Sequence, residues 1–421
     1  MTSDRTVRRE TTGQVHTRTN ATLLLVLCGA CAPSTDGGER PPTEPYLFVW
    51  TTDSDSVDLN FLAVVDASPA SDRYGEVLST LAVPTKGRTR GHHTEHRMPA
   101  DGFLFANDFG TGKTYILDLR DPLSPSVADS FVAAGPLVSP HSFERLPGGN
   151  VIATFQNEGP GNSDAGGLAE LDARGRTVRW ARADAGNRYV RPYSLAVVPK
   201  LDRVVTGSAD MRGAADSRVL QIWRLSDLTP LATLDLPEDW GAAAEPRVLP
   251  DGETVLISTF GCKLLRIDDL ATDSPSVSLA YDFGGENCAV PVVANNLWIQ
   301  TVPEIHGLVA LDVANPELLH EVSRLVLGDD DWPHWISLEP GGRRIVVTGY
   351  AGTRHRILMI HLDGTTGRMS VDSAFTSPGE RLPGVSFDRV DWPHGATGPA
   401  DPHGVVFSRL ASSPPALPHK R

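Results

Sequence analysis

Short apolar runs rich in β-branched and aromatic residues recur along the chain, with polar turns between them. Several of these runs directly follow a turn that contains proline and glycine, as expected where one strand ends and the next begins. The clearest examples are Phe103–Ala106, Val151–Phe155, Thr254–Ser258 and Ile345–Thr348. No helical periodicity of useful length competes with them. The pattern predicts an all-β protein made of many short strands.

A second regularity divides the strands into units. An apolar residue and an aspartate close a strand-rich segment seven times, at Asp66, Asp118, Asp172, Asp227, Asp268, Asp312 and Asp363, and in the fourth a serine stands between the two. The steps between these aspartates are 52, 54, 55, 41, 44 and 51 residues. A repeat of this length with four strands is typical of a propeller blade. Seven units predict a seven-bladed β-propeller; two packed β-sandwiches are the alternative, but they would not need the long period.

The two ends of this region also fit a closed ring. Val405–Ser408 is a lone strand near the C-terminus, while Tyr46–Trp50 and Phe61–Val65 are strands near the N-terminus. Joined in one blade, they would remove the open strand edges of a broken ring. The propeller is therefore expected to span residues 46–410.

One conspicuous residue or pair stands at the start of the first strand of each unit. From His93 the steps are 48, 52, 52, 43 and 46 residues, and then 60 or 69. The first strand of a blade lines the propeller axis, so these residues are expected to meet at one mouth of the central channel. They are His92, His93 and His96, then His141, Tyr193, Glu245, Cys288 and His334, and finally His394 or His403.

Histidines occupy these positions in the first, second, sixth and seventh units, which are neighbours in a closed ring. Imidazole nitrogens from several strands at one focus are typical of metal sites, and they suit copper, zinc, iron and nickel alike. The predicted ligands are His92, His93, His141, His334, His394 and His403, with the last two as alternatives. Because side chains alternate along a strand, at most one of His92 and His93 is expected to face the axis. The out-of-phase histidines, interpreted as ordinary loop residues, are His16, His320, His355, His361 and His419.

Other polar residues are expected on the same mouth of the channel. A substrate pocket there would be shaped by His96, Asp108, Glu158, Tyr193, Glu245 and Glu304. Cys262 and Cys288 would lie on this face in consecutive units, so a disulfide is predicted between them, with a thiolate metal ligand at Cys288 as the alternative. The sequence singles out no catalytic acid, base or nucleophile.

The N-terminal region has the order of an export signal. Arginines precede a short apolar run at residues 21–27, and Cys31 follows Gly29-Ala30 as in a bacterial lipobox. We interpret residues 1–31 as an export signal with lipidation at Cys31, residues 32–45 as a flexible linker and residues 411–421 as a disordered tail. Cleavage and release without a lipid, or a wrongly placed start, are the alternatives. A net charge of −14 excludes nucleic acid as an expected partner.

The histidine motifs resemble those of the selenium-binding protein/methanethiol oxidase family. The resemblance rests on Gly91-His-His-Thr-Glu-His96, Pro140-His-Ser-Phe143, Trp332-Pro-His334 and the two C-terminal Pro-His-Gly motifs. It implies a seven-bladed propeller and, for bacterial members, an exported copper enzyme that oxidises methanethiol. By motif position the copper ligands would be His92, His93, His141 and one of His394 or His403. The chain lacks a cysteine between Cys31 and Cys262, where the family carries its selenium-binding cysteine, and this departure marks a divergent member.

The first functional hypothesis is therefore an exported, copper-dependent oxidoreductase that acts on a small sulfur compound. It would contact a membrane only through an N-terminal lipid. The alternatives are a non-catalytic binding propeller that holds zinc, another structural metal or none, and a hydrolase that resembles propeller lactonases and uses Ca²⁺. The last alternative is disfavoured because few carboxylates occupy the axial positions.

Overall fold

The computed structural model describes residues 45–409, except 87–88, 160, 162–163, 184–185, 187–188, 213–216 and 350–351. The predicted export signal with Cys31, almost all of the predicted linker and the predicted C-terminal tail lie outside the described residues. Within the described part, no helix has the length and apolar character that a membrane crossing requires.

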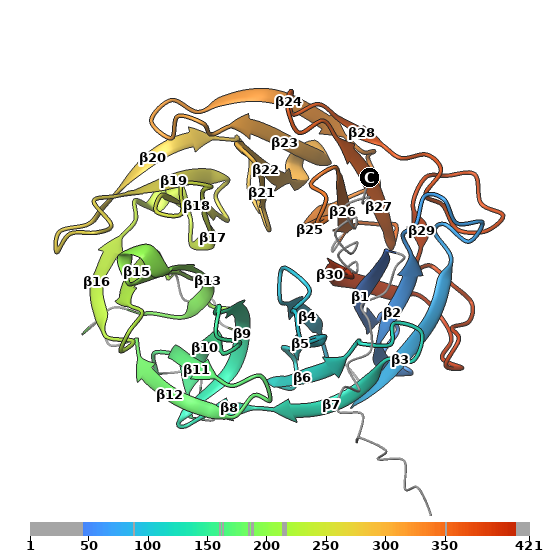
Figure 1. Ribbon diagram of the computed structural model, residues 1–421, viewed down its shortest axis with the longest axis horizontal. Helices are drawn as coiled ribbons and strands as arrows, with labels where there is room; N and C mark the ends of the chain where they lie inside the picture. Colours follow the sequence, from blue (N-terminus) through green and yellow to red (C-terminus); the bar gives the residue numbers. More distant parts are fainter. Residues whose placement is uncertain are drawn as a thin grey trace, which may run out of the picture. The chain divides into compact units, whose positions relative to one another are not determined.

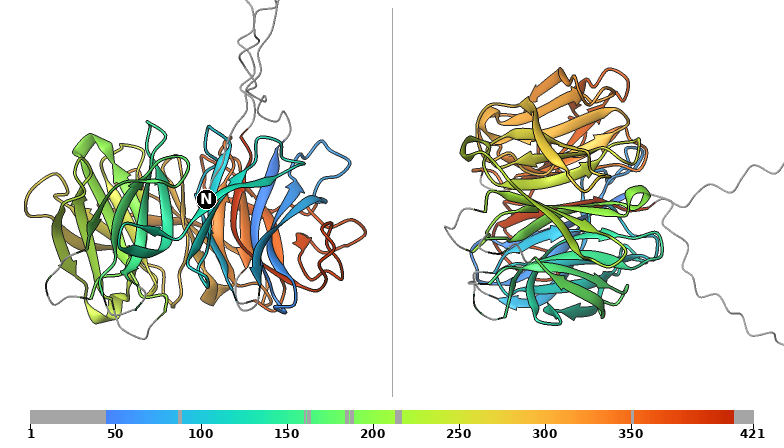
Figure 2. Two further views of the ribbon diagram at one scale, coloured as in Figure 1. Left: turned by 90° about the horizontal axis from the view of Figure 1, so that it is seen from below. Right: turned by 90° about the vertical axis from the view of Figure 1, so that its left-hand side faces the viewer.

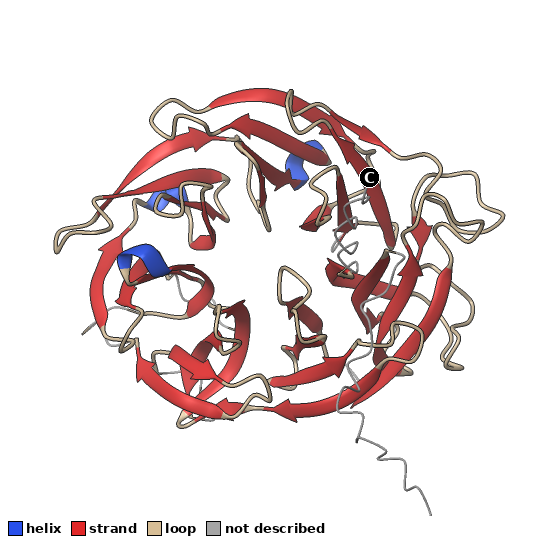
Figure 3. Cartoon of the chain, viewed as in Figure 1, coloured by secondary structure: helices blue, strands red, loops and turns tan. Residues whose placement is uncertain are grey.

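The described residues form a seven-bladed β-propeller, as predicted (Figure 1). Each blade is an antiparallel sheet whose first strand lies nearest the central axis. Figure 3 shows how completely strands dominate the ring. In the side views of Figure 2 the blades stand next to one another around the axis. The described helical segments are three short 3-10 turns, η1 (Pro199–Leu201), η2 (Glu238–Trp240) and η3 (Pro303–Ile305).

In the first four blades the strands follow one another from the axis outward. Blade 1 contains β4 (Gly91–Thr94), β5 (Phe103–Asp108), β6 (Lys113–Asp118) and β7 (Ser126–Phe131). Blade 2 contains β9 (Leu137–Arg145), β10 (Val151–Glu158), β11 (Gly167–Leu171) and β12 (Thr177–Arg182), with the short β8 (Ala133–Ala134) beside β9. Blade 3 contains β13 (Pro192–Val198), β14 (Arg203–Ser208), β15 (Val219–Arg224) and β16 (Pro230–Asp235). Blade 4 contains β17 (Ala243–Val248), β18 (Val255–Thr259), β19 (Lys263–Asp268) and β20 (Ser276–Asp282).

The remaining three blades have the same order. Blade 5 contains β21 (Val292–Ala294), β22 (Leu297–Val302), β23 (Gly307–Asp312) and β24 (His320–Val326). Blade 6 contains β25 (Pro333–Leu338), β26 (Arg344–Gly349), β27 (Arg356–Leu362) and β28 (Met369–Val371), with β29 (Val385–Ser386) also on β27. Blade 7 contains β30 (Ala400–Phe407), β1 (Tyr46–Asp53), β2 (Leu59–Asp66) and β3 (Val77–Lys86).

The repeated aspartates mark the end of the third strand of each blade for a local reason. At six of the seven positions the carboxylate accepts a hydrogen bond from the backbone N–H two residues later, for example from Ser68 to Asp66 at 2.8 Å and from Arg174 to Asp172 at 2.8 Å. Such Asx turns reverse the chain after a strand. The period read from the sequence therefore reports a turn that each blade repeats.

The core lies between blades. Each hydrophobic cluster joins the facing sheets of two neighbours: one packs Leu47 and Phe61 of blade 7 against Met359 of blade 6, and another packs Phe48 of blade 7 against Leu104 of blade 1. Comparable clusters fill the other five interfaces. Burial of this apolar area stabilises the ring, and it fixes the distance of each inner strand from the axis.

Blade 7 closes the ring with strands from both ends of the described chain. β30 pairs with β1 in antiparallel register, with Leu47 opposite Phe407 and Val49 opposite Val405. The N–H of Ser408 also donates to the carbonyl of Tyr46 at 2.8 Å. The predicted one-blade closure is therefore present.

A disulfide joins Cys262 and Cys288, whose Cα atoms are 4.9 Å apart. Cys262 lies in the turn between β18 and β19 of blade 4, and Cys288 precedes β21 of blade 5. The bond links consecutive blades on the mouth of the channel where the inner strands begin. Since its sulfur is bonded to Cys262, Cys288 offers no thiolate to a metal.

Candidate metal centre

The inner strands of six blades share an irregularity near their beginnings. In each one the register with the second strand shifts by one residue, which is a β-bulge. A bulge changes the direction in which the local side chains point. Four of the bulges carry the predicted axial histidines, at His92–His93 in β4, His141 in β9, His334 in β25 and His403 in β30.

His92 and His93 both join the resulting cluster. Their rings stack with centroids 4.4 Å apart and an interplanar angle of 7°. Between Gly91 and Thr94, β4 has one more residue than the stretch of β5 opposite, so two successive side chains fall on the same side. The expectation that at most one of them faces the axis was wrong, because alternation holds only along a regular strand.

The centre of the cluster consists of His92, His93 and His141. Each offers a ring nitrogen, and these three atoms lie within 4.8 Å of one another. The ring centroids of His93 and His141 are 4.2 Å apart, and those of His92 and His141 are 5.0 Å apart. All three side chains are buried, with at most 2% of their surface exposed.

Hydrogen bonds on the outer side orient two of these rings. His141 Nδ1 donates to the carbonyl oxygen of Tyr193 at 2.9 Å, which places the proton on Nδ1 and leaves a lone pair on Nε2. The Ser142 hydroxyl lies 3.1 Å from His141 Nδ1 and 2.8 Å from His93 Nδ1. Ser142 therefore ties the rings of blades 1 and 2 together. Metal-binding histidines commonly have partners of this kind on the nitrogen that does not bind the metal.

Asn107 fixes the backbone beneath the same rings. Its side-chain oxygen accepts the N–H of His93 at 2.7 Å, and its amide nitrogen donates to the carbonyl of His141 at 2.9 Å. One buried amide thus fixes the positions of the inner strands of blades 1 and 2 relative to each other.

Each of the three central histidines has one buried ring nitrogen without a partner among the described residues. Nδ1 of His92, Nε2 of His93 and Nε2 of His141 have no hydrogen-bond partner among the described residues. A buried polar atom without a partner costs about 1–3 kcal/mol. One ion that accepted all three lone pairs would remove that cost, and metal–nitrogen distances of about 2.0–2.1 Å would require the rings to close slightly. The residues present therefore fit a metal ion with imidazole ligands.

The cluster is also electrically suited to a cation. Burial lowers the pKa of His92 and His93 well below the usual histidine value, and the neighbouring histidines lower both further. Burial lowers the pKa of His141 to about 3, although its bond to the Tyr193 carbonyl opposes this shift. The imidazoles are therefore neutral at neutral pH, which is the form that binds metals.

His403 and His334 extend the cluster into blades 7 and 6. The His403 ring lies 4.3 Å from that of His92, and the His334 ring lies 4.7 Å from that of His403. Burial lowers the pKa of His334 to about 4, with a smaller contribution from Arg90. The structure thus brings five of the six predicted ligand candidates to one focus.

His394 lies elsewhere. Its Nδ1 is 2.7 Å from the hydroxyl of Thr80 on the outermost strand of blade 7, and its ring packs 4.8 Å from that of Phe61. The reason is topological: residue 394 belongs to the connection that precedes β30, whereas the axial strand begins only at Ala400. Of the two alternatives for the last unit, His403 is the axial residue.

Aromatic side chains enclose the histidines. Tyr193 lies 4.1 Å from the His141 ring, Phe109 lies 5.7 Å from it, and Trp335 stands edge-on 5.0 Å from the His93 ring. These three side chains are buried. The surroundings of the cluster are therefore largely apolar.

Three of the predicted pocket residues lie at the ends of second strands or in a 3-10 turn. Asp108 accepts from Asn60 at 2.8 Å and from the N–H of Thr111 at 3.0 Å, so it closes a turn. Glu158 forms an ion pair with Arg182 at 2.5 Å. Glu304 lies in the first turn of η3. The expected pocket of Asp108, Glu158 and Glu304 at the histidines stays a prediction.

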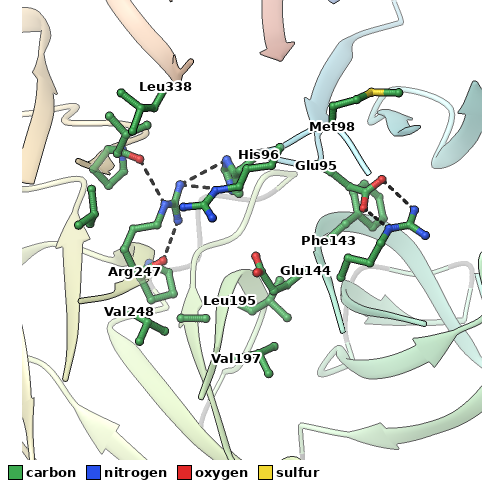
Figure 4. A pocket seen from close by; sticks show the side chains of 17 residues that line it. Glu95, His96, Met98, Phe143, Glu144, Leu195, Val197, Arg247, Val248 and Leu338 are labelled. Atoms are coloured by element: carbon green, nitrogen blue, oxygen red, sulfur yellow. Dashed lines mark hydrogen bonds and ion pairs between the residues drawn. The ribbon is translucent and has the colours of Figure 1, made fainter. Parts of the chain in front are cut away.

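His96 and Glu245 lie beyond the bulges, toward the opposite mouth. The His96 ring stacks on Trp335 with centroids 4.8 Å apart, and His96 Nε2 is 3.8 Å from Glu245 Oε2. Glu245 also accepts from Ser194 at 2.8 Å. His96 lines a separate cavity, drawn in Figure 4, in which neither His93 nor His141 takes part.

Sequence reasoning missed the supporting roles of Ser142 and Trp335. One signal was available: a serine follows the axial residue in both His141-Ser142 and Tyr193-Ser194. Nothing in the sequence pattern pointed to Trp335 as the side chain between the cluster and the cavity.

Comparison with known proteins gives a consistent result. No protein-family model matches the chain. A methanethiol oxidase of a Hyphomicrobium species is 31% identical over 173 residues, which cover 39% of this chain and 38% of that protein. A methanethiol oxidase of Ruegeria pomeroyi is 30% identical over 136 residues, covering 30% and 29%. The chain thus matches well under half the length of these curated relatives.

Among solved structures, a hypothetical selenium-binding protein from Sulfolobus tokodaii has a TM-score of 0.68 at 14% identity. The superposition covers 90% of this chain and 97% of that protein, and it shows a common propeller fold. The chain is similar to the selenium-binding protein/methanethiol oxidase family, in sequence over about a third of its length and in fold over nearly all of it.

Proposed function

We propose that this protein is an exported, copper-dependent oxidoreductase that oxidises a small thiol such as methanethiol. The observation that carries the proposal is the set of three unpartnered, buried imidazole nitrogens of His92, His93 and His141. Copper stands highest among the divalent ions in affinity for nitrogen ligands. The relatives named methanethiol oxidase support the reaction class.

In this proposal His92, His93 and His141 hold the ion, and His403 is placed to supply a fourth nitrogen. Bound copper would supply one-electron redox chemistry between the thiol and dioxygen. The other residues keep the ligands in place: Ser142 orients the His93 ring, and the Tyr193 carbonyl keeps the His141 proton on Nδ1.

The aromatic side chains also set the polarity of the surroundings of the site. Phe109, Tyr193 and Trp335 surround the imidazoles with apolar surface and exclude bulk water. An uncharged substrate with a short alkyl group would enter such surroundings at little desolvation cost, whereas a charged one would be strongly disfavoured. This preference supports a small, uncharged thiol.

A non-catalytic propeller with a structural metal is the second candidate. It is favoured by the burial of His93 and His141, whose side chains have no exposed surface. A metal held there for stability alone would need no route for a substrate.

The test is metal analysis of the purified mature protein, followed by oxygen uptake with methanethiol. We expect copper, thiol-dependent oxygen uptake, and loss of both in His141→Ala, with His361→Ala unchanged because that side chain is 54% exposed on β27. Bound metal without oxygen uptake would favour the structural role. Calcium in place of copper would favour a hydrolase.

Export is part of the proposal and has its own test. The arginine-bearing start, the apolar run at 21–27 and Cys31 support it. Mass spectrometry of the native protein should show that the first 27 to 30 residues are absent, with a lipid on Cys31 if the lipobox functions. An intact Met1 on cytoplasmic protein would contradict export.

A further inference from the structure

A cavity of about 430 Å³ opens at the end of the channel opposite the histidine cluster (Figure 4). It is lined by the later parts of the inner strands of blades 2 to 6 and, in blade 1, by residues 95–98 after β4. Trp335 contacts both regions, because His96, which lines the cavity, stacks on its indole, while the His93 ring lies nearly perpendicular to it with centroids 5.0 Å apart. None of His92, His93, His141 and His403 lines the cavity, so it is a second site beside the proposed metal centre.

Two of the charged groups around the cavity are neutralised within the protein. Arg145 donates to Glu95 at 2.9 and 3.1 Å. Arg247 donates to Glu245 at 3.0 Å and to the Pro246 carbonyl at 2.7 Å. These pairs contribute polar walls but no net charge.

Two further charged groups have no such partner. Within the described part of the chain, neither Glu144 nor Arg97 forms a hydrogen bond or ion pair through its side chain, and both line the cavity. Glu144 is half-buried on β9, and its carboxylate is visible inside the cavity in Figure 4. Burial raises the pKa of Glu144, while Arg247 and Arg97 oppose that rise, so both guanidinium groups are near enough to interact with it.

Apolar side chains form another part of the wall. Phe143, Leu195, Val197, Val248 and Leu338 line the cavity together with Glu144. A few placed polar groups beside apolar surface are the usual arrangement by which a protein orients a small ligand.

The charges restrict what that ligand can be. A simple cation would be drawn to Glu144 but repelled by Arg97, and a simple anion would be drawn to Arg97 but repelled by Glu144. A molecule that carries both charges satisfies both groups. We propose that this cavity binds a small zwitterion of the α-amino acid class, with its ammonium on Glu144, its carboxylate on Arg97 and an apolar side chain against the wall.

The test is calorimetric titration of the full mature protein with leucine and two matched probes. 3-Methylbutylamine lacks the carboxylate, and 4-methylpentanoate lacks the ammonium. We expect leucine to bind about tenfold or more tightly than either probe, since each loses one charge-assisted hydrogen bond. Methionine and phenylalanine serve as further zwitterions with apolar side chains.

Variants connect the binding to the two residues. Glu144→Gln should weaken leucine binding about tenfold or more, as should Arg97→Gln, while Glu317→Gln, an exposed glutamate with a side chain 79% accessible, should not. Thermal unfolding and metal content verify that each variant keeps its fold and its histidine centre. Failure of all three amino acids to bind at millimolar concentration, or binding unchanged in both cavity variants, would overturn the inference. Tighter binding of the amine or the carboxylate probe than of leucine would also overturn it.

Discussion

At the scale of single residues, the support of the histidines decides what they can do. Ser142 touches the Nδ1 atoms of His93 and His141, and Asn107 holds the backbone of both strands. Without these contacts the five imidazoles could still lie near the axis, but nothing would orient their nitrogen lone pairs toward one common point. The sequence identified the histidines from their phase, whereas the supporting partners act through contacts between blades, for which the serine after the axial residue was a local signal.

Replacing Ser142 tests this support. Ser142→Ala removes the hydroxyl between the two rings, so the rings can rotate and the His93 proton can move between its nitrogens. We expect copper affinity to fall about 10–100-fold, as for other partners of metal-binding histidines. Competition with a chelator of known affinity measures the change. Ser258→Ala, which removes a buried serine of blade 4, should leave the affinity as it is.

His355 gives a second prediction at this scale. Its imidazole lies 2.6 Å from Asp401 on β30 and 2.5 Å from Asp388, and the bond to Asp401 is the main reason that its pKa is raised to about 9. The sequence placed it among ordinary loop histidines, but in the structure it joins blade 6 to blade 7. A histidine whose pKa is raised in the folded state contributes its full stabilisation at pH values below its pKa in the unfolded chain, about 6.5. The contribution is lost as the pH rises above its pKa in the folded protein.

We therefore expect His355→Gln to lower the free energy of unfolding by about 1–3 kcal/mol near pH 6. The difference from the wild type should shrink as the pH rises through about 9. Denaturant unfolding at several pH values measures it. A difference that is constant with pH would rule out a charged His355 as the cause.

At the scale of elements, the sequence predicts the turns that end the third strands but not the bulges of the inner strands. The aspartates predict the blades because six of the seven close their own turn, as Asp66 and Asp172 do. The bulges of the inner strands were not predicted, because a register shift depends on the strand opposite. The wrong expectation that at most one of His92 and His93 faces the axis arose because the bulge in β4 was not predicted.

The disulfide between blades 4 and 5 is the prediction at this scale. Closing a loop over a separation of 26 residues should stabilise the folded protein by about 3 kcal/mol through the unfolded chain. Cys262→Ala/Cys288→Ala should unfold at correspondingly lower denaturant concentration. Thiol titration of the unfolded, unreduced mature protein should find neither cysteine reactive, and two reactive thiols would count against the bond.

At the scale of the whole molecule, ring closure creates the centre. His403 belongs to the last described strand and His92 to the first strand of blade 1, yet their rings lie 4.3 Å apart because β30 completes blade 7 next to blade 1. The sequence predicted this convergence from the number of units. It could not predict the cavity near the other mouth, since that cavity is defined by residues from six blades.

The central claim is that His92, His93 and His141 hold one metal ion, and electron paramagnetic resonance of the mature protein with one equivalent of Cu(II) tests it most directly. We predict a single copper species whose spectrum shows coupling to several imidazole nitrogens. In His141→Ala the affinity should fall and the spectrum should change, while circular dichroism shows an intact propeller. His361→Ala should match the wild type. A His141→Ala protein that binds copper with the same affinity and the same spectrum would contradict the claim.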